Sequence, residues 1–176
     1  MNWVKDYVTT IADYPKPGIM FRDVTTIFES DVAYNRMVEE FVRHLRDKKI
    51  DKVAGIEARG FILGGAIAHR LGIGFITVRK AGKLPRETHS VNYMLEYGED
   101  ALEVHCDAIR KGDNILIVDD LIATGGTAIA THELITMAGG RVTDCVFIID
   151  LPDLGGADKL RAKGCDVFSL TAYEGE

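Results

Sequence analysis

The chain has few of the features that stabilise secreted or membrane proteins. Only three of its 176 residues are cysteine, an odd number without a C-x-x-C pair, which argues against a disulfide framework or a thiolate zinc site. The longest apolar runs, residues 115–118 and 146–149, fall far short of the roughly 20 residues that a membrane helix requires. We therefore interpret the cysteines as buried or half-buried thiols and expect a soluble protein.

Basic residues are also in the minority. There are 21 lysines and arginines against 27 acidic residues, which gives a net charge of -6 and disfavours a surface for long nucleic acids. A local cationic pocket for a small anion remains compatible with this balance. Residues 1–7 carry a charge of each sign and no apolar signal-peptide core, so we expect a cytoplasmic protein.

The composition is that of one globular domain. Hydrophobic residues make up 47% and charged residues 27%, and 18 glycines against 4 prolines indicate many tight turns. A chain of this length can bury roughly 70% of the surface that its unfolded form exposes. We find no linker, repeat or low-complexity stretch, and we predict a single domain over residues 1–176.

Strand patterns alternate with helix patterns along the chain. Apolar residues spaced three and four apart from Tyr34 to Leu45 predict an amphipathic helix. Further helices are expected from Arg59 to Gly72, around 127–138 and over 157–163, and strands over 52–57, 74–79, 114–119, 141–150 and 167–171. This order predicts an α/β fold, a doubly wound and mostly parallel sheet with helices on both faces.

Residues 80–105 interrupt the alternation. The polar segment 80–92 predicts a mobile loop. Residues 91–97 and 101–104 are expected to pair as antiparallel strands around a turn at 98–100. The region is therefore predicted to be a flexible loop followed by a β-hairpin.

The strongest candidate site follows the apolar strand 115–118. After this strand, the chain continues as Asp119-Asp-Leu-Ile-Ala-Thr-Gly-Gly-Thr127 into the next predicted helix. Glycines allow backbone N–H groups to converge, and the helix adds its positive dipole end, so the turn predicts a cradle for one phosphate. The two aspartates would repel a phosphate but accept hydrogen bonds from sugar hydroxyls. A phosphorylated ribose meets both demands.

Plainer interpretations exist for each half of this segment. Two glycines before a helix are often only a turn, and paired aspartates often cap a helix. An apolar run ending in Asp-Asp also resembles half of a P-loop nucleotidase, but the chain has no G-x-x-x-x-G-K-[ST] sequence. The combination of both halves favours the sugar phosphate.

Val118-Asp-Asp-Leu-Ile-Ala-Thr-Gly-Gly-Thr127 resembles the phosphoribosyl pyrophosphate (PRPP) motif of type I phosphoribosyltransferases. Four further segments, 13–23, 57–61, 79–85 and 95–98, are similar in order and spacing to those of the adenine-specific branch of that family. The resemblance implies a small N-terminal hood over residues 1–30. It also implies transfer of phosphoribose from PRPP to N9 of adenine, giving AMP and pyrophosphate in purine salvage, by a homodimer.

The resemblance also implies roles for individual residues. Glu96 is implied as general acid/base at N7 of adenine and Arg59 as a catalytic cation. Tyr97, beside Glu96, is expected to be a packing or lid-positioning aromatic rather than a catalyst. The residues implied at PRPP or AMP are Asp119, Asp120, Ala123, Thr124, Gly125, Gly126 and Thr127. Those implied at pyrophosphate are Glu57, Ala58, Arg59, Arg79 and Lys83, with a cis peptide between Glu57 and Ala58. Those implied at adenine are Met20, Phe21, Arg22 and Leu151.

Magnesium is the implied cofactor, carried by the oxygens of the substrate and by water rather than by a protein cage. His132-Glu133 begins like the zinc motif H-E-x-x-H, but Thr136 stands where the second histidine would be. We therefore expect no metal ligand set in the protein itself.

Alternatives remain open from the residues alone. Glu96 could be a solvent-facing strand residue, Phe21 and Leu151 core residues, and Arg79 and Lys83 solvated loop cations. For the whole chain, the rivals are a transferase for a 6-oxopurine and a PRPP-sensing regulator without turnover. The acidic balance weighs against a regulator that binds DNA.

The substitution Glu96→Gln tests the implied general acid/base. Such proton assistance contributes about 10² to 10⁴ in rate, so the variant should lose kcat on that scale while its affinity for PRPP stays largely unchanged. Steady-state kinetics and equilibrium binding of PRPP measure the two effects. An unimpaired kcat would remove Glu96 from the mechanism.

Overall fold

Seven strands form one mixed sheet in the order β5-β6-β4-β3-β7-β8-β9. The computed structural model describes residues 2–94 and 99–175. The strands are β3 (Lys52–Ile56), β4 (Gly74–Lys80), β5 (Thr88–Met94), β6 (Glu99–His105), β7 (Asn114–Ile122), β8 (Arg141–Asp150) and β9 (Asp166–Ala172). The five strands from β4 to β9 pair in parallel, and β6 joins β4 and β5 antiparallel. The predicted mostly parallel sheet is confirmed.

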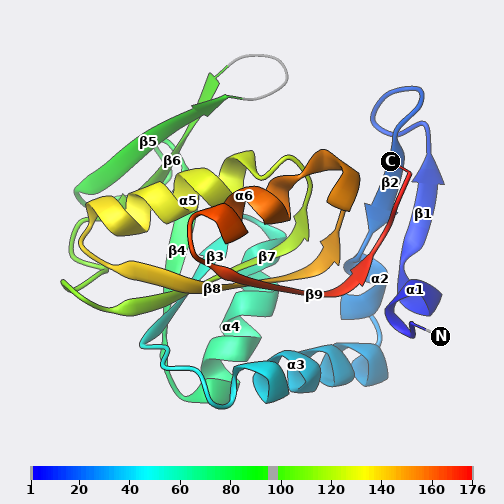
Figure 1. The fold of residues 1–176 in the computed structure, drawn as a ribbon, viewed down its shortest axis with the longest axis horizontal. Helices are drawn as coiled ribbons and strands as arrows, with labels where there is room; N and C mark the ends of the chain where they lie inside the picture. Colours follow the sequence, from blue (N-terminus) through cyan, green and yellow to red (C-terminus); the bar gives the residue numbers. More distant parts are fainter. Residues whose placement is uncertain (1, 95–98, 176) are drawn as a thin grey trace.

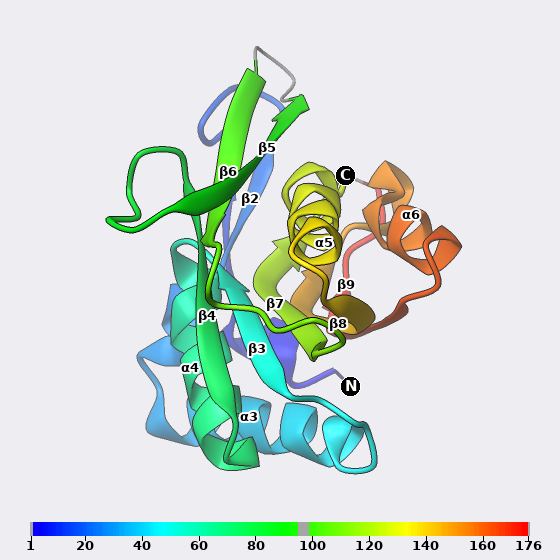
Figure 2. The same cartoon turned by 90° about the vertical axis from the view of Figure 1, so that its left-hand side faces the viewer.

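Helices cover both faces of this sheet (Figure 1). Helices α3 (Asp31–Leu45) and α4 (Arg59–Leu71) lie on one face, and α5 (Gly126–Met137) and α6 (Gly156–Ala162) lie on the other. Each pair covers its own apolar core, one including Phe41 and Leu63 and the other Phe147 and Leu134. The turned view in Figure 2 shows the sheet between the two layers. The doubly wound arrangement is therefore confirmed.

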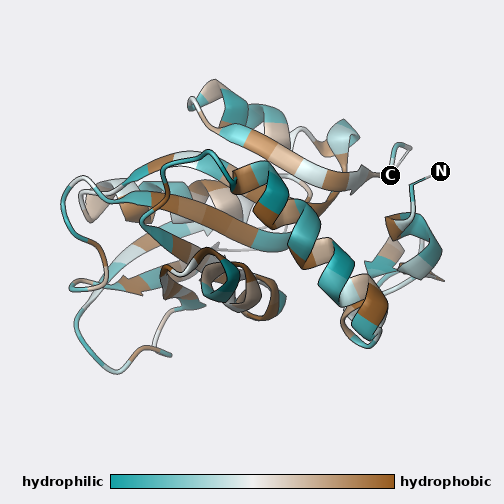
Figure 3. Cartoon of the chain, turned by 90° about the horizontal axis from the view of Figure 1, so that it is seen from below, coloured by the Kyte–Doolittle hydropathy of each residue, from teal (hydrophilic) through white to brown (hydrophobic). Residues whose placement is uncertain are grey.

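Helix α3 shows how the sequence pattern becomes structure. The Ser30 side chain accepts a hydrogen bond from the Ala33 amide at 3.2 Å and so caps the start of the helix. Met37, Phe41 and Leu45, spaced four apart, are all buried against the sheet. Figure 3 views this side of the molecule and shows apolar and polar residues alternating along the helix. The predicted amphipathic helix is confirmed, with its start three residues before Tyr34.

A small N-terminal unit flanks one end of the main sheet. It contains α1 (Val4–Tyr7), the antiparallel pair β1 (Thr9–Ala12) and β2 (Met20–Asp23), and α2 (Thr25–Phe28). Its contacts with the rest of the chain are long-range: the Arg22 guanidinium lies 4.1 Å from the centre of the Tyr173 ring, and Asn2 donates to the Leu170 carbonyl at 2.9 Å. Strand β9 and the Tyr173 that follows it therefore help to hold this N-terminal unit, the hood, in place.

The region after β4 differs from the sequence prediction. Strand β5 begins at Thr88, so the predicted loop over 80–92 is too long. Glu99 and Asp100, predicted as part of a turn, pair with Met94 and Tyr93 as strand residues. Polar residues dominate here, but cross-strand pairing with an apolar inner face outweighs their weak strand preference. The predicted antiparallel pairing itself is confirmed.

Two further differences concern β7 and the helices. Strand β7 continues through Asp119 and Asp120 to Ile122, because β8 pairs alongside it as far as Asp150. The short helix η1 (Pro152–Leu154) follows β8 and was not predicted. Within the described part of the chain, none of the helices has both the length and the apolar character to cross a membrane.

Candidate active site

A cleft of about 400 Å³ lies beyond the carboxyl ends of β3 and β7, the position where open α/β sheets bind ligands. Four segments border it: the hood strand β2, the loop between β3 and α4, the end of β7 with the loop that follows, and the residue after β8. Its lining residues are Ile19, Met20, Phe21, Arg22, Glu57, Ala58, Arg59, Asp119, Asp120, Leu121, Ala123, Thr127 and Leu151. Segments far apart in sequence thus form one cavity.

The start of α4 approaches the end of β7 very closely. A Cβ atom on Gly60 would lie 2.8 Å from the Val118 carbonyl oxygen and 3.0 Å from Asp119 Oδ1. Only glycine therefore allows this approach. It brings Nε of Arg59 into an ion pair and hydrogen bond with Oδ2 of Asp120, whose side chain is nearly buried. The pair joins the start of α4 to the end of β7.

The charges of the cleft shift the pKa values of Asp119 and Arg59. Burial raises the pKa of Asp119 well above its ordinary value of 3.8, and the neighbouring charge of Asp120 raises it further. Burial lowers the pKa of Arg59, but the charge of Asp120 and its hydrogen bond outweigh this and raise the pKa overall. The cleft therefore holds one paired carboxylate and one carboxyl group with a strong tendency to keep its proton.

The turn after β7 has the geometry of an anion cradle. Gly125 has φ +84°, a conformation that favours glycine, and it directly precedes α5. The first amides of that helix have no partner within the helix and are available to an anion. The turn therefore has the positive φ and the helix start on which the cradle prediction depends.

Helix α6 supports this turn from behind. The Gly156 amide donates to the Ala123 carbonyl at 3.0 Å, and Lys159 Nζ donates to the Thr124 carbonyl at 2.9 Å. A Cβ on Gly125 would lie 2.9 Å from the Gly156 Cα. The loop is therefore held between α5 and α6 by two glycines that face each other.

Glu57 forms ion pairs with Arg79 and Lys83, two of the cations that the sequence predicts at pyrophosphate. Its nearly buried carboxylate accepts hydrogen bonds from Arg79 Nε and Lys83 Nζ, each at 2.8 Å, and from the Lys80 amide at 3.2 Å. Burial raises the pKa of Glu57, but the hydrogen bonds from Lys83 and Arg79 outweigh it and lower the pKa overall. The peptide between Glu57 and Ala58 is cis, as the family resemblance implied.

Part of the cleft lining is apolar. Met20 and Phe21 from β2 face the same cavity as Leu151, the residue after β8. Tyr14 packs edge-on against Phe21, with ring centres 5.1 Å apart, and so restricts its orientation. The Leu151 amide donates to the Ile122 carbonyl at 3.0 Å, so Leu151 is held next to the end of β7.

The structure brings most of the sequence-predicted residues together, with some exceptions. Thr124, Gly125 and Gly126 belong to the cradle turn but do not line the cavity, and Arg79 and Lys83 reach it only through Glu57. Glu96 and Tyr97 lie outside the described residues. The sequence analysis missed Ile19 and Leu121. Each adjoins a predicted residue, and this adjacency was the only signal that could have found them.

The residues present fit a magnesium ion that arrives with its substrate. Among residues 2–94 and 99–175, no three His, Cys, Asp or Glu side chains are grouped to hold a metal ion. Magnesium prefers oxygen ligands and keeps several of its waters, and phosphate oxygens are common partners. Asp120 is already paired with Arg59, and Asp119 tends to keep its proton, so these residues fit an ion that is carried by the oxygens of a substrate and by water.

Comparison with known proteins identifies the class to which this fold and cleft belong. The phosphoribosyl transferase domain family matches residues 25–172. This match covers most of the chain and includes the end of β7, the cradle turn and the residue after β8. The chain belongs to the phosphoribosyltransferase family.

Its relatives define the branch more narrowly. The adenine phosphoribosyltransferase of Brucella anthropi is 57% identical over 173 residues, 98% of this chain and 96% of the relative. The solved enzyme of the same name from Thermoanaerobacter pseudethanolicus superposes with a TM-score of 0.93 at 44% identity, covering 97% of this chain and 98% of the other. That of Saccharomyces cerevisiae, solved with adenine and an imino-altritol bisphosphate, has a TM-score of 0.90 at 38% identity and covers 96% of each chain. Within the family, this chain groups with the adenine phosphoribosyltransferases, which are pentosyltransferases.

The contact between Gly125 and Gly156 leads to a prediction about stability. Gly125→Ala should lower the free energy of unfolding by about 1–3 kcal/mol, because the residue must keep its positive φ and its Cβ meets the Gly156 backbone. Gly65→Ala is the matched control, since Gly65 lies within α4 with open space beside it. Urea unfolding of both variants measures the effect. Equal stability of the two would contradict the proposed packing of the turn.

The raised pKa of Asp119 leads to a second prediction. The folded protein binds the proton of the Asp119 carboxyl group more tightly than the unfolded chain does. This binding adds to the free energy of unfolding below pH of about 4, and the contribution is lost as the pH rises through the raised pKa. Asp119→Asn removes that loss, and its stability relative to the wild type should increase from pH 4 to pH 7. Unfolding at both pH values measures it, with Asp107→Asn as an exposed control. A constant difference would contradict the raised pKa.

Proposed function

We propose that this chain transfers 5-phosphoribose from PRPP to N9 of adenine and releases AMP and pyrophosphate, as a purine salvage enzyme. The observation that carries the proposal is a single cleft lined by charged residues from the segment after β3 and the end of β7 and by apolar residues from β2 and the residue after β8. The charged and polar groups suit a phosphorylated sugar, and the apolar side chains suit a flat, uncharged base. The names of the relatives, which share the fold and most of the chain length, support the same reaction.

In this proposal the sugar phosphate binds along the end of β7. Asp119 and Asp120 accept hydrogen bonds from the two free ribose hydroxyls. The turn from Ala123 to Thr127, including Thr124, Gly125 and Gly126, binds the 5′-phosphate through its amides and hydroxyl groups. The support of this turn by α6 keeps the amides aligned before the substrate arrives, so little order must be gained on binding.

The pyrophosphate leaving group meets the segment after β3. Arg59, Arg79 and Lys83 are proposed to stabilise the negative charge that develops there, together with the peptide groups of Glu57 and Ala58. Arg79 and Lys83 are held by Glu57, so pyrophosphate would compete with that carboxylate for them. Magnesium, when bound through substrate oxygens and water, would supply additional positive charge for the leaving group.

Adenine is proposed to bind between Phe21 and Leu151, with backbone groups of Met20 and Arg22 at its amino edge. Among the solved relatives, the Saccharomyces cerevisiae enzyme contains adenine and the Giardia lamblia enzyme, 36% identical, contains 9-deazaadenine. Glu96 is proposed as the general acid/base at N7, and Tyr97 as an aromatic that positions a lid. A lid formed by the loop after β4 would exclude water from PRPP.

We extend the proposal to the organisation of the chain. Residues 1–176 act as one phosphoribosyltransferase domain, with residues 1–30 as its hood and 80–105 as its flexible loop and hairpin. The family relationship supports a homodimer, with magnesium as its cofactor. A cytoplasmic location is supported by the three free cysteines, since reducing compartments keep thiols unpaired.

Turnover of the purified protein with PRPP, magnesium and each purine base tests the function. Pyrophosphate release should be at least about 100-fold faster per unit of base with adenine than with hypoxanthine, guanine or xanthine, because backbone groups at the base edge distinguish an amino group from an oxo group. Turnover with 6-oxopurines alone would make the protein a different transferase. Binding of PRPP without turnover of any base would indicate the regulator.

A further inference from the structure

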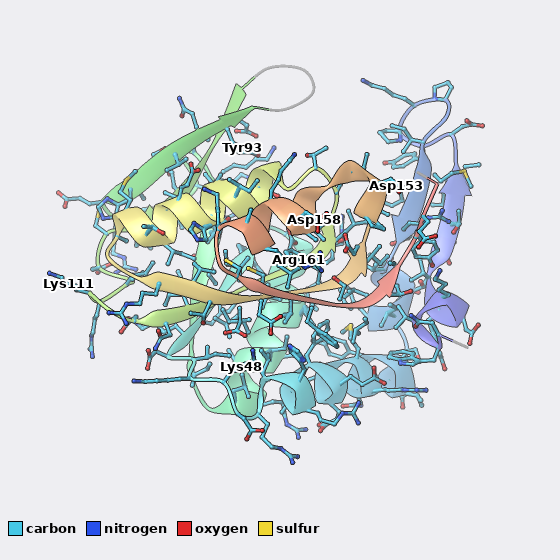
Figure 4. The ribbon with its side chains drawn as sticks, viewed as in Figure 1. Lys48, Tyr93, Lys111, Asp153, Asp158 and Arg161 are labelled. Atoms are coloured by element: carbon cyan, nitrogen blue, oxygen red, sulfur yellow. The ribbon has the colours of Figure 1, made fainter. Side chains whose placement is uncertain are left out.

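The chain after β9 runs beside the end of β8 and the short helix that follows it. The Tyr173 amide donates to the Asp150 carbonyl at 3.0 Å, and the Gly175 amide donates to Asp153 Oδ2 at 2.6 Å. Asp153, labelled in Figure 4, belongs to η1. Leu151, which lines the cleft, lies between these two contacts along the chain. The two hydrogen bonds therefore hold the backbone after β9 against the stretch that carries Leu151.

The side chain of Tyr173 contacts the hood. The Arg22 guanidinium lies 4.1 Å from the centre of its ring, and Lys5 Nζ lies 4.5 Å from it. Arg22 belongs to β2, next to Phe21, and it also donates to Thr10 Oγ1 in β1 at 2.6 Å. An aromatic face attracts a cation, and more strongly where water is partly excluded, as at this half-buried tyrosine. The ring therefore holds β2 through the residue that follows Phe21.

Tyr173 thus links the two apolar parts of the cleft lining. Phe21 and Leu151 come from β2 and from the chain after β8, two segments far apart in sequence. Tyr173 is bound to the neighbour of each, since its ring contacts Arg22 and its amide donates to Asp150. The lining of the cleft includes Arg22 but not Tyr173 itself. The tyrosine therefore acts on the cleft through the residues that it holds.

We propose that Tyr173 is a positioning residue that sets the distance between Phe21 and Leu151, the two walls of the base pocket. This inference rests on the proposed function, in which the base binds between these side chains. The hood consists of short strands and helices, and its contact with the Tyr173 ring restricts it to positions that complete the pocket. When the contact is lost, the apparent affinity for the base falls with the fraction of molecules in which the pocket is complete.

Tyr173→Leu tests the inference, because it removes the aromatic face and keeps an apolar side chain. KM for adenine should rise about tenfold, and kcat and KM for PRPP should change by less than about twofold. The turn proposed to bind the sugar phosphate is held by α6, so loosening the hood leaves it in place. Tyr173→Phe keeps the aromatic face, and its KM for adenine should stay within about twofold of the wild type.

Arg22→Met tests the same contact from the hood. It removes the cation and keeps the backbone groups of residue 22 that are proposed to face the base, so KM for adenine should again rise about tenfold. The double variant with Tyr173→Leu should show no larger rise than the greater of the two single variants, since both remove one contact. Multiplying effects would contradict a shared role.

Tyr7→Leu is the matched control. It makes the same chemical change within the hood, where the half-exposed Tyr7 ring packs edge-on against Trp3 with ring centres 6.0 Å apart. Its KM for adenine should stay within about twofold of the wild type. An unchanged KM for adenine in Tyr173→Leu, or an equal rise in Tyr7→Leu or in Tyr173→Phe, would overturn the inference.

A binding measurement without turnover separates this inference from the proposed function. AMP and ribose 5-phosphate share the sugar phosphate, and only AMP carries the base. In isothermal titration calorimetry, Tyr173→Leu should bind AMP about tenfold more weakly and ribose 5-phosphate less than about twofold more weakly, whereas partial unfolding would weaken both equally. Equal weakening, or unchanged AMP affinity, would overturn the positioning role even in an active enzyme. Selective weakening of AMP binding in a protein without adenine turnover would instead contradict only the proposed function.

Discussion

The close approach of α4 to β7 is the constraint on which the site depends. Without a side chain at Gly60, the first turn of α4 reaches the end of the neighbouring strand, and Arg59 pairs with Asp120. A single methyl group at Gly60 would push the start of α4 away from the end of β7, because it would meet the Val118 carbonyl oxygen at 2.8 Å. Positive charge and the acid pair share one cleft only because this position is glycine.

The charges of the cleft largely neutralise one another. Arg59 is paired with Asp120, and Arg79 and Lys83 are paired with Glu57. In a partly buried site, such pairing offsets part of the cost of removing charged groups from water. In the proposed reaction, a polyanionic substrate that carries its own metal ion would exchange partners with these pairs. The arrangement therefore keeps these partly exposed cations paired next to the proposed position of the leaving group.

The central part of the fold was predictable because its patterns are local. The predicted strand 141–150 coincides with β8, and the strand–turn–helix around Gly125 appears where the glycines and apolar runs placed it. The hood was harder to predict from the sequence, because its short strands lack a periodic pattern and its position depends on contacts with Tyr173. The start of β5 at Thr88 was missed for a similar reason, since it follows from pairing with His105.

The sequence by itself determined the turn that is proposed to bind the sugar phosphate, since glycine conformation and the start of a helix are properties of adjacent residues. Tertiary structure alone decided which distant groups meet that turn. It placed Ile19 and Leu121 in the cleft, Glu57 between two cations and Gly156 behind Gly125. These contacts join residues far apart along the chain, and they form because packing of the sheet and its helices brings separate loops to one edge.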